Sequence, residues 1–323
     1  MTSEFNLIQQ YFQSHPQTRE DVVLGIGDDC ALLSSPSDQQ LAMSTDTLVE
    51  GVHYYPNADP HAIGHKALAV SLSDLAAMGA TPAWVMLSLT LDQAKEEWIK
   101  AFCEGFFALL DQHHMTLIGG NMSSGPSSIT TQVTGFLPKG SGMRRSGARP
   151  GDHIYVTGYL GDAALALAGL KGQVNLSEQL SIFQKALDYP VPRVKAGLNL
   201  RDVAHAAIDI SDGLIADLGH ILEQSGVGAT IKLEHIPLSQ AAQHLIASHQ
   251  LTFEEVIQYA LTGGDDYELC FTAPPSIVES LEIDCLCTRI GVIETAESFR
   301  LLLKGEAFQG GSRRGFEHFV RSY

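Results

Sequence analysis

Acidic residues recur in this 323-residue chain beside glycine, serine or threonine, where an apolar run ends. Asp209-Ile-Ser-Asp212-Gly213-Leu214 places two carboxylates and a hydroxyl where a predicted strand gives way to a predicted helix. Carboxylates collected in this way repel one another, and hard divalent cations with oxygen ligands relieve that repulsion best. We therefore expect a metal–phosphate site. Four other stretches share the pattern: Gly27-Asp28-Asp29, Ser44-Thr45-Asp46, Ser73-Asp74 and Gly263-Gly264-Asp265-Asp266.

The individual acids differ in how strongly they indicate a metal. Taken alone, Asp28-Asp29 and Asp46 are more typical of a helix cap or an Asx turn. Asp74 is more informative, because its apolar surroundings would exclude a lone carboxylate unless it is paired or bound. Asp209 is more informative still, since it follows the apolar run 206–208 and a second acid comes three residues later.

Two glycine pairs would allow a phosphate to approach the backbone, although such pairs are usually plain turns. They are Gly119-Gly120 and Gly263-Gly264. The chain has neither a P-loop motif nor the glycine-rich loop of protein kinases. Arg144, Arg145 and Arg149 are the cationic candidates for holding phosphate, but a solvated basic linker explains them equally well.

Two further residues keep two interpretations at this stage. His53 lies in a loop beside two tyrosines, where it either packs locally or contacts a phosphate. Phe316 is either a core residue or a stacking platform for a flat ring.

Composition excludes several classes of protein. The formal net charge of −17 argues against nucleic acid as the main ligand, because lysine and arginine hold phosphate backbones. The 45% hydrophobic and 18% charged fractions are those of a soluble globular protein. No signal peptide or membrane span is predicted. The five cysteines lack the spacing of a zinc site, which predicts reduced, buried thiols in a cytoplasmic protein. No EF-hand spacing supports a calcium module.

The order of apolar runs predicts two α/β (α+β) domains with mixed sheets, because strands and helices intermingle without a strict βαβ period. We expect an N-terminal domain over 1–138, a Gly/Pro/Arg-rich linker over 139–152 and a C-terminal domain over 153–323. The positioning elements expected are strands at 22–27, 40–44, 117–118, 128–137 and 206–210, and helices at 61–78, 163–170 (capped by Asp162), 214–223 and 275–281.

The ordered set of motifs resembles the bacterial thiamine-monophosphate kinases, members of the aminoimidazole-ribonucleotide-synthetase-like ATP-binding superfamily. The resemblance implies that two-domain architecture, in a homodimer whose N-terminal sheets pair. The resembling stretches are Gly25-Ile-Gly-Asp-Asp-Cys30-Ala, Ser44-Thr-Asp-Thr-Leu-Val49, Leu72-Ser-Asp-Leu-Ala-Ala-Met-Gly79-Ala, Arg145-Ser-Gly-Ala-Arg-Pro-Gly-Asp152, Ile208-Asp-Ile-Ser-Asp-Gly-Leu214 and Gly263-Gly-Asp-Asp-Tyr-Glu-Leu269.

The resemblance also implies a reaction: ATP-dependent phosphorylation of thiamine monophosphate to thiamine diphosphate, with several Mg²⁺ ions between the phosphates. Arg145 and Asp212 are the residues expected to act in catalysis. By position, the metal ligands would be Asp29, Ser44, Thr45, Asp46, Asp74, Asn121, Asp209 and Asp212; the ATP-binding residues Gly120, Asn121, Arg145 and Ser211; and the substrate-binding residues His53, Asp265 and Phe316.

Three positions depart from the family pattern. Asn121 stands where the family usually has a metal-binding aspartate, so one negative charge is lost. Asp265 is one methylene shorter than the usual glutamate. Phe316 replaces a common tryptophan or tyrosine, which keeps ring stacking but removes a polar handle.

The implied mechanism is direct in-line transfer of the ATP γ-phosphoryl group. No general base is needed, because a phosphomonoester acceptor has a second pKa near ~6 and is largely ionised at neutral pH. Two alternatives stay open. One is another superfamily enzyme, such as an aminoimidazole ribonucleotide synthetase or a selenophosphate synthetase. The other, suggested by Asn121, is a catalytically weak protein that binds nucleotide or thiamine phosphate.

Overall fold

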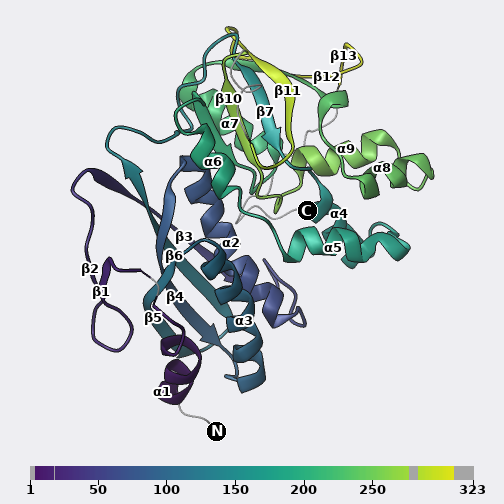
Figure 1. Ribbon diagram of the computed structural model, residues 1–323. Coiled ribbons are helices and arrows are strands. Elements are labelled where there is room, and N and C mark those ends of the chain that lie inside the picture. Colours follow the sequence, from purple (N-terminus) through teal and green to yellow (C-terminus); the bar gives the residue numbers. More distant parts are fainter. Residues whose placement is uncertain (1–3, 18, 276–282, 309–323) are drawn as a thin grey trace. The chain divides into compact units, whose positions relative to one another are not determined.

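The computed structural model describes residues 4–17, 19–275 and 283–308. These residues divide into two compact units, each combining helices with a sheet (Figure 1). Unit 1 comprises Met1–Leu75 and Ala80–Ser141, and unit 2 comprises Ala76–Gly79 and Gly142–Tyr323.

Unit 1 is built on a mixed four-stranded sheet of order β3-β6-β4-β5. The β3–β6 and β6–β4 pairs are antiparallel, whereas β4 and β5 run parallel. Alternation places Ile129, Thr131 and Val133 of β6 in the core, as the sequence pattern predicts. The elements are α1 (Glu4–Leu7), a π-helix (Ile8–Gln13), β1 (Val22–Leu24), β2 (Leu32–Leu33), β3 (Gln39–Val49), α2 (Pro60–Met78), β4 (Thr81–Leu91), α3 (Glu96–Gln112), β5 (Thr116–Ser124) and β6 (Ser128–Pro138).

Two strands of unit 1 are longer than the sequence indicates. β3 pairs with β6 without a break from Gln39 to Val49, so Asp46 lies within the strand and not in a turn after it. β5 likewise runs through Gly120, which was predicted to lie in a turn. A Cβ at Gly120 would lie 1.8 Å from the Leu87 carbonyl oxygen, so the glycine permits a close strand contact.

Unit 2 contains a seven-stranded mixed sheet of order β13-β12-β9-β11-β7-β10-β8. Three strands of this sheet, β7, β10 and β8, are almost entirely buried, and α7 and α9 contribute to the same core. The elements are β7 (His153–Thr157), α4 (Asp162–Leu170), a 3₁₀ turn (Ser177–Gln179), α5 (Leu180–Asp188), α6 (Val194–Leu200), β8 (Ala206–Asp209), α7 (Leu214–Ser225), β9 (Gly228–Lys232), a 3₁₀ turn (Leu233–His235), α8 (Gln240–Ala247), α9 (Phe253–Thr262), β10 (Leu269–Ala273), β11 (Cys287–Glu294), β12 (Phe299–Leu303) and β13 (Glu306–Ala307).

Three further predictions concern the cap of α4, the helix at 275–281 and the cysteines. Asp162 does not cap α4: Gly161 precedes the helix at φ 89°, and Asp162 is its first residue, bonded to Ser239. The helix expected over 275–281 falls almost wholly outside the described residues. Cys103 and Cys270 are buried, as expected.

The prediction that the other three cysteines are buried is wrong. Cys30 is exposed in a surface turn, and Cys285 and Cys287 are half-buried at the start of β11. Among the described helices, none combines the length and apolarity needed to cross a bilayer.

The contact between α2 and α3 generates a stability prediction. A Cβ at Gly105 would lie 1.9 Å from the His61 carbonyl oxygen, so Gly105→Ala should lower the free energy of unfolding by about 1–3 kcal/mol through overpacking. Urea unfolding followed by tryptophan fluorescence reports unit 1, because both tryptophans, Trp84 and Trp98, lie there. The control Gly219→Ala, with nothing within 4 Å of its new Cβ, should not lower this transition. An unchanged midpoint for Gly105→Ala would contradict the packing described.

Candidate active site

In unit 1, strand β3 and helix α2 bring two predicted carboxylate ligands together. Ser71 of α2 donates a hydrogen bond to Asp46 Oδ2 at 2.8 Å, and Ser44 of β3 donates one to Asp74 Oδ2. Thr131 of β6, opposite Asp46 in the sheet, lies 2.8 Å from the Ser71 hydroxyl and donates to the Ala67 carbonyl. Hydroxyl groups from three elements therefore hold the two acids in place.

The negative charges of Asp46 and Asp74 repel each other. Burial, together with the negative charge of Asp74, raises the pKa of Asp46 to about 6, and the hydrogen bond from Ser71 only partly opposes this. A divalent cation would relieve this repulsion.

The donor set at this site suits Mg²⁺. Mg²⁺ commonly takes one or two carboxylates and completes its shell with water and phosphate oxygens. Across the described parts of the chain, no group of three or more His, Cys, Asp or Glu gathers as an all-protein metal site. Asp46 and Asp74 with the Ser44 hydroxyl therefore fit a magnesium–phosphate site better than a closed metal cage.

Other predicted unit 1 ligands are placed differently. Thr45 lies between Ser44 and Asp46 in β3, so its side chain faces the opposite side of the sheet, where it donates to the Thr131 carbonyl at 3.1 Å. Only its main-chain oxygen could reach the cation. Asp29 is exposed, and its amide donates to the Asp28 carboxylate at 2.9 Å in a local turn.

Gly120 and Asn121 are exposed on β5 and line a pocket with apolar side chains of the N-terminal segment and the sheet. The other lining residues are Ile8, Phe12, Ile26, Leu87, Leu89, Leu117, Gly119 and Met122. The pocket is therefore mainly apolar, and Asn121 adds a polar side chain to its lining.

The loop after β3 fixes the orientation of His53. The Val49 amide donates to His53 Nδ1 at 3.0 Å, so the neutral ring carries its proton on Nε2. The buried Lys66 of α2 donates to the His53 carbonyl at 3.3 Å. The ring is thus held with Nε2 as a hydrogen-bond donor.

In unit 2, β8 ends at Asp209, and the acidic turn that follows carries Ser211 and Asp212. Asp209 is only 5% exposed and pairs with Leu269 in β10. The carboxylate of Asp217, one turn into α7, accepts the backbone amides of Asp212 and Gly213. Burial raises the pKa of Asp217 to about 7, and the nearby charge of Asp212 adds to this while the donated amides oppose it.

The loop before β10 packs directly on this turn. The Asp265 amide donates to the Ser211 carbonyl at 2.9 Å, and the Tyr267 amide donates to the Ile210 carbonyl at 2.8 Å. The Tyr267 hydroxyl donates to Asp265 Oδ1 at 3.0 Å. Asp265 itself has φ 68°, a conformation that aspartate tolerates better than most residues. Asp265 is therefore positioned beside the acidic turn.

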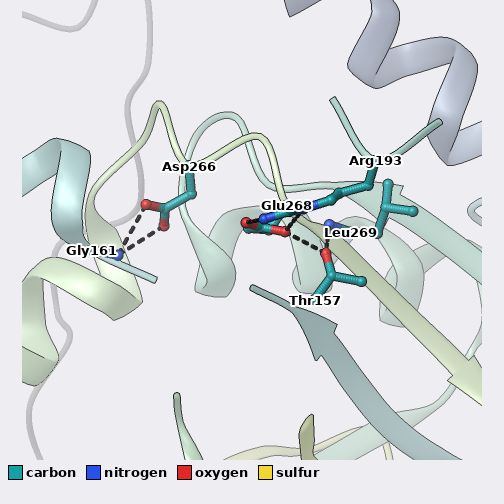
Figure 2. A network of polar contacts seen from close by, with 6 residues as sticks. All are labelled: Thr157, Gly161, Arg193, Asp266, Glu268 and Leu269. Atoms are coloured by element: carbon teal, nitrogen blue, oxygen red, sulfur yellow. Dashed lines mark hydrogen bonds and ion pairs between the residues drawn. The ribbon is translucent and has the colours of Figure 1, made fainter. Parts of the chain in front are cut away.

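Figure 2 shows how the acids after Asp265 anchor this loop. Asp266 accepts the Gly161 amide at 2.9 Å and 3.1 Å with its two oxygens. Glu268 receives the guanidinium of Arg193 as a fork, at 2.6 Å and 2.5 Å, and the Thr157 hydroxyl at 2.6 Å. The Asp266 and Glu268 carboxylates are therefore occupied by structural contacts.

Arg145 lies in unit 2, in the segment that runs beside β8. The Ala207 amide of β8 donates to the Arg144 carbonyl at 2.9 Å, which holds this segment along the strand that ends at Asp209. Arg145 is exposed. Phe316 lies outside the described residues.

Sequence reasoning missed several residues that support the site. Ser71 lies three positions before Asp74 on the predicted helix, and that spacing was an available signal. The other supporting residues have no local signal. Contacts between residues distant in sequence define the roles of Thr131 and of the Arg193–Glu268 pair. The role of Asp217 depends on a contact back across one helix turn.

The repulsion between Asp46 and Asp74 yields a second prediction. Asp46→Asn should stabilise the ligand-free protein in EDTA at pH 8 by on the order of 1–3 kcal/mol, because it removes one of two opposed buried charges. The same substitution should reduce the rise in melting temperature that Mg²⁺ produces in the wild-type protein. Thermal unfolding with EDTA and with Mg²⁺ measures both effects, and a variant that is destabilised in EDTA but keeps the full Mg²⁺ response would refute the arrangement.

Comparison with known proteins identifies the family. Residues 27–137 match the model for the N-terminal domain of AIR synthase related proteins, and residues 149–300 match the model for their C-terminal domain. The chain is 50% identical over 274 residues to thiamine-monophosphate kinase of Salmonella typhimurium, covering 84% of this chain and 82% of that protein.

Solved structures agree in fold. The crystal structure of thiamine-monophosphate kinase from Stenotrophomonas maltophilia superposes with a TM-score of 0.85 at 44% identity, covering 95% of this chain and 98% of that one. AaThiL complexed with AMPPCP and TMP superposes with a TM-score of 0.77 at 30% identity, covering 98% of this chain and 97% of that one. The mixed two-domain architecture expected from the sequence is confirmed, and the chain belongs to the AIR synthase related family and, within it, to the thiamine-monophosphate kinases.

Proposed function

We propose that this protein phosphorylates thiamine monophosphate to thiamine diphosphate, with ATP as the phosphoryl donor. The observation that carries the proposal is the likeness, over nearly the whole chain, to AaThiL, which was solved with the ATP analogue AMPPCP and with TMP bound. The acidic sites of the two units agree with this reaction, because joining two phosphate groups requires their negative charges to be neutralised.

The carboxylates are proposed to hold Mg²⁺ with the phosphates. Ser44, Asp46 and Asp74 would do so in unit 1, and Asp209 and Asp212 in unit 2. When bound, Mg²⁺ would neutralise charge on the phosphoryl group being transferred.

The remaining polar residues are proposed to bind and orient the two substrates. Gly120 and Asn121 line the apolar pocket of unit 1, which we assign to the nucleotide, and Ser211 and the exposed Arg145 of unit 2 would also hold ATP. His53 would donate a hydrogen bond from Nε2 to the acceptor phosphate, and Asp265 would contact the thiamine part. Phe316, outside the described residues, keeps its expected role beside the substrate ring.

The reaction we propose is direct in-line transfer without a general base. The acceptor is a phosphomonoester that is mostly ionised at neutral pH, since its second pKa lies near ~6. The chain must therefore align two anions and offset their charge, and Arg145 supplies a cation for this without giving up a proton. The site is accordingly rich in metal ligands and poor in acid–base residues.

A homodimer is the proposed assembly. Three large apolar side chains on the four-stranded sheet of unit 1 are exposed: Leu41 by 47%, Met43 by 61% and Met86 by 41%. Apolar side chains gathered on one sheet commonly mark an interaction surface. A second copy of the same sheet would cover them.

A product assay tests the function. Purified protein is incubated with MgATP and thiamine monophosphate, and thiamine diphosphate and ADP are quantified beside reactions with thiamine or with no acceptor. Equal amounts of both products, dependent on thiamine monophosphate, are expected. Nucleotide binding without product would favour the one specific rival, a binding protein, which Asn121 suggests; restored turnover in Asn121→Asp would then assign the loss to the missing carboxylate.

Substitutions of single acids test the metal assignment. Asp74→Asn and Asp212→Asn should each lower kcat by on the order of 10²-fold or more, because each removes charge that offsets the phosphates. The matched controls Asp92→Asn and Asp202→Asn change exposed acids, one in each unit, and should keep wild-type rates. Near-wild-type turnover of Asp74→Asn at ordinary Mg²⁺ would remove Asp74 from the metal site.

A further inference from the structure

Asp217 occupies an unusual place at the start of α7. Helix amides in the first turn are usually capped by the side chain of the residue just before the helix. That residue here is Gly213, which has no side chain. Asp217 instead reaches back from one turn inside, and a single oxygen, Oδ2, accepts the Asp212 amide at 3.0 Å and the Gly213 amide at 3.1 Å.

The burial of Asp217 sets it apart from an ordinary surface cap. The residue is only 3% exposed, and no salt-bridge partner offsets its charge among the described residues. Burying a carboxylate is costly, whereas an apolar residue at this core-facing helix position would cost nothing of this kind. What the carboxylate provides is a fixed backbone at two consecutive residues of the acidic turn.

The same turn is held from its other side. The Asp265 amide donates to the Ser211 carbonyl, so Ser211 is fixed through its oxygen and the next two residues through their amides. Three successive residues are thereby clamped between the loop before β10 and the Asp217 carboxylate. Their side chains have little freedom to turn away from a ligand.

We propose that Asp217 is a positioning residue for nucleotide binding: its carboxylate fixes the turn at 211–213, so that Ser211 and Asp212 are already oriented before MgATP arrives. The inference rests on the proposed use of Ser211 and Asp212 for nucleotide and metal, and it adds a residue that touches neither. Preorganisation of this kind improves affinity by reducing the conformational freedom lost on binding.

A purely structural cap would behave differently. Loss of an N-cap lowers helix or protein stability and leaves the affinity of a folded protein for its ligand unchanged. A positioning residue changes ligand affinity in protein that remains folded. The two roles are therefore separated by measuring affinity and stability on the same variants.

Three variants make the test. Asp217→Leu removes the acceptor at similar size, and Asp217→Asn keeps one carbonyl oxygen, which suffices because Oδ2 alone accepts both amides. Thr252→Ala removes the capping box of α9 in the same unit and serves as the matched control for lost capping. Affinity for AMPPCP with Mg²⁺ is measured by calorimetry, and exchange of the amides at 211–213 is measured by hydrogen–deuterium exchange without ligand.

The expected pattern has three parts. Asp217→Leu weakens Mg²⁺–AMPPCP binding by about tenfold or more and speeds exchange at 211–213, Asp217→Asn stays within about threefold of wild type, and Thr252→Ala loses stability without losing affinity. Wild-type affinity in folded Asp217→Leu would overturn the proposal, as would an Asn variant as weak as the Leu variant.

Three further outcomes are also decisive. If Asp217→Leu does not fold, Asp217→Glu, which keeps the charge but moves the acceptor by one methylene, is expected to weaken affinity, and wild-type affinity there overturns the proposal. If nucleotide affinity depends on Asp217 as expected but no thiamine diphosphate forms, the kinase function fails and the positioning role stands. If the wild-type protein binds no nucleotide, both are overturned.

Discussion

Repulsion between neighbouring carboxylates is the constraint on which the rest of this structure depends. Asp46 and Asp74 lie close together between β3 and α2, and Asp212 follows Asp209, the last residue of β8, by three positions. The fold tolerates the first pair through serine hydroxyls and holds the second turn through backbone amides bound to Asp217. Both groups of carboxylates would suit cations that arrive with phosphate.

The two units prepare their acids in different ways. In unit 1 the acids stand on a long strand and a long buried helix, whose backbone hydrogen bonds already fix their positions. In unit 2, Asp209 ends β8 and is held by the ladder with β10, whereas Asp212 stands on the turn after the strand, which has no ladder of its own. The extra anchors there, Asp217 beneath the turn and the Arg193–Glu268 pair at the start of β10, compensate for that freedom. Breaking a buried ion pair of this kind typically costs about 3–5 kcal/mol.

Local sequence patterns predict some of the elements that carry these acids and miss others. The helix carrying Asp74 and the strand before Asp209 were predictable, because apolar periodicity and glycine stops are local signals. The length of β3 was not, since pairing with β6 extends the strand through Ser44–Asp46 against the local turn preference. From the sequence alone, Asp217 is an ordinary residue of the predicted helix, because only the folded turn brings the amides of Asp212 and Gly213 to its carboxylate.

The dependence of nucleotide binding on divalent cation tests the central claim most directly. Calorimetry would compare the affinity of the purified protein for AMPPCP in Mg²⁺ and in EDTA, at one ionic strength. If uncompensated carboxylates line the site, binding should be weaker in EDTA by about a hundredfold or more, because the nucleotide phosphates would then meet the carboxylates directly. Equal affinity in the two conditions would contradict the account, since it would mean that the acids do not face the nucleotide.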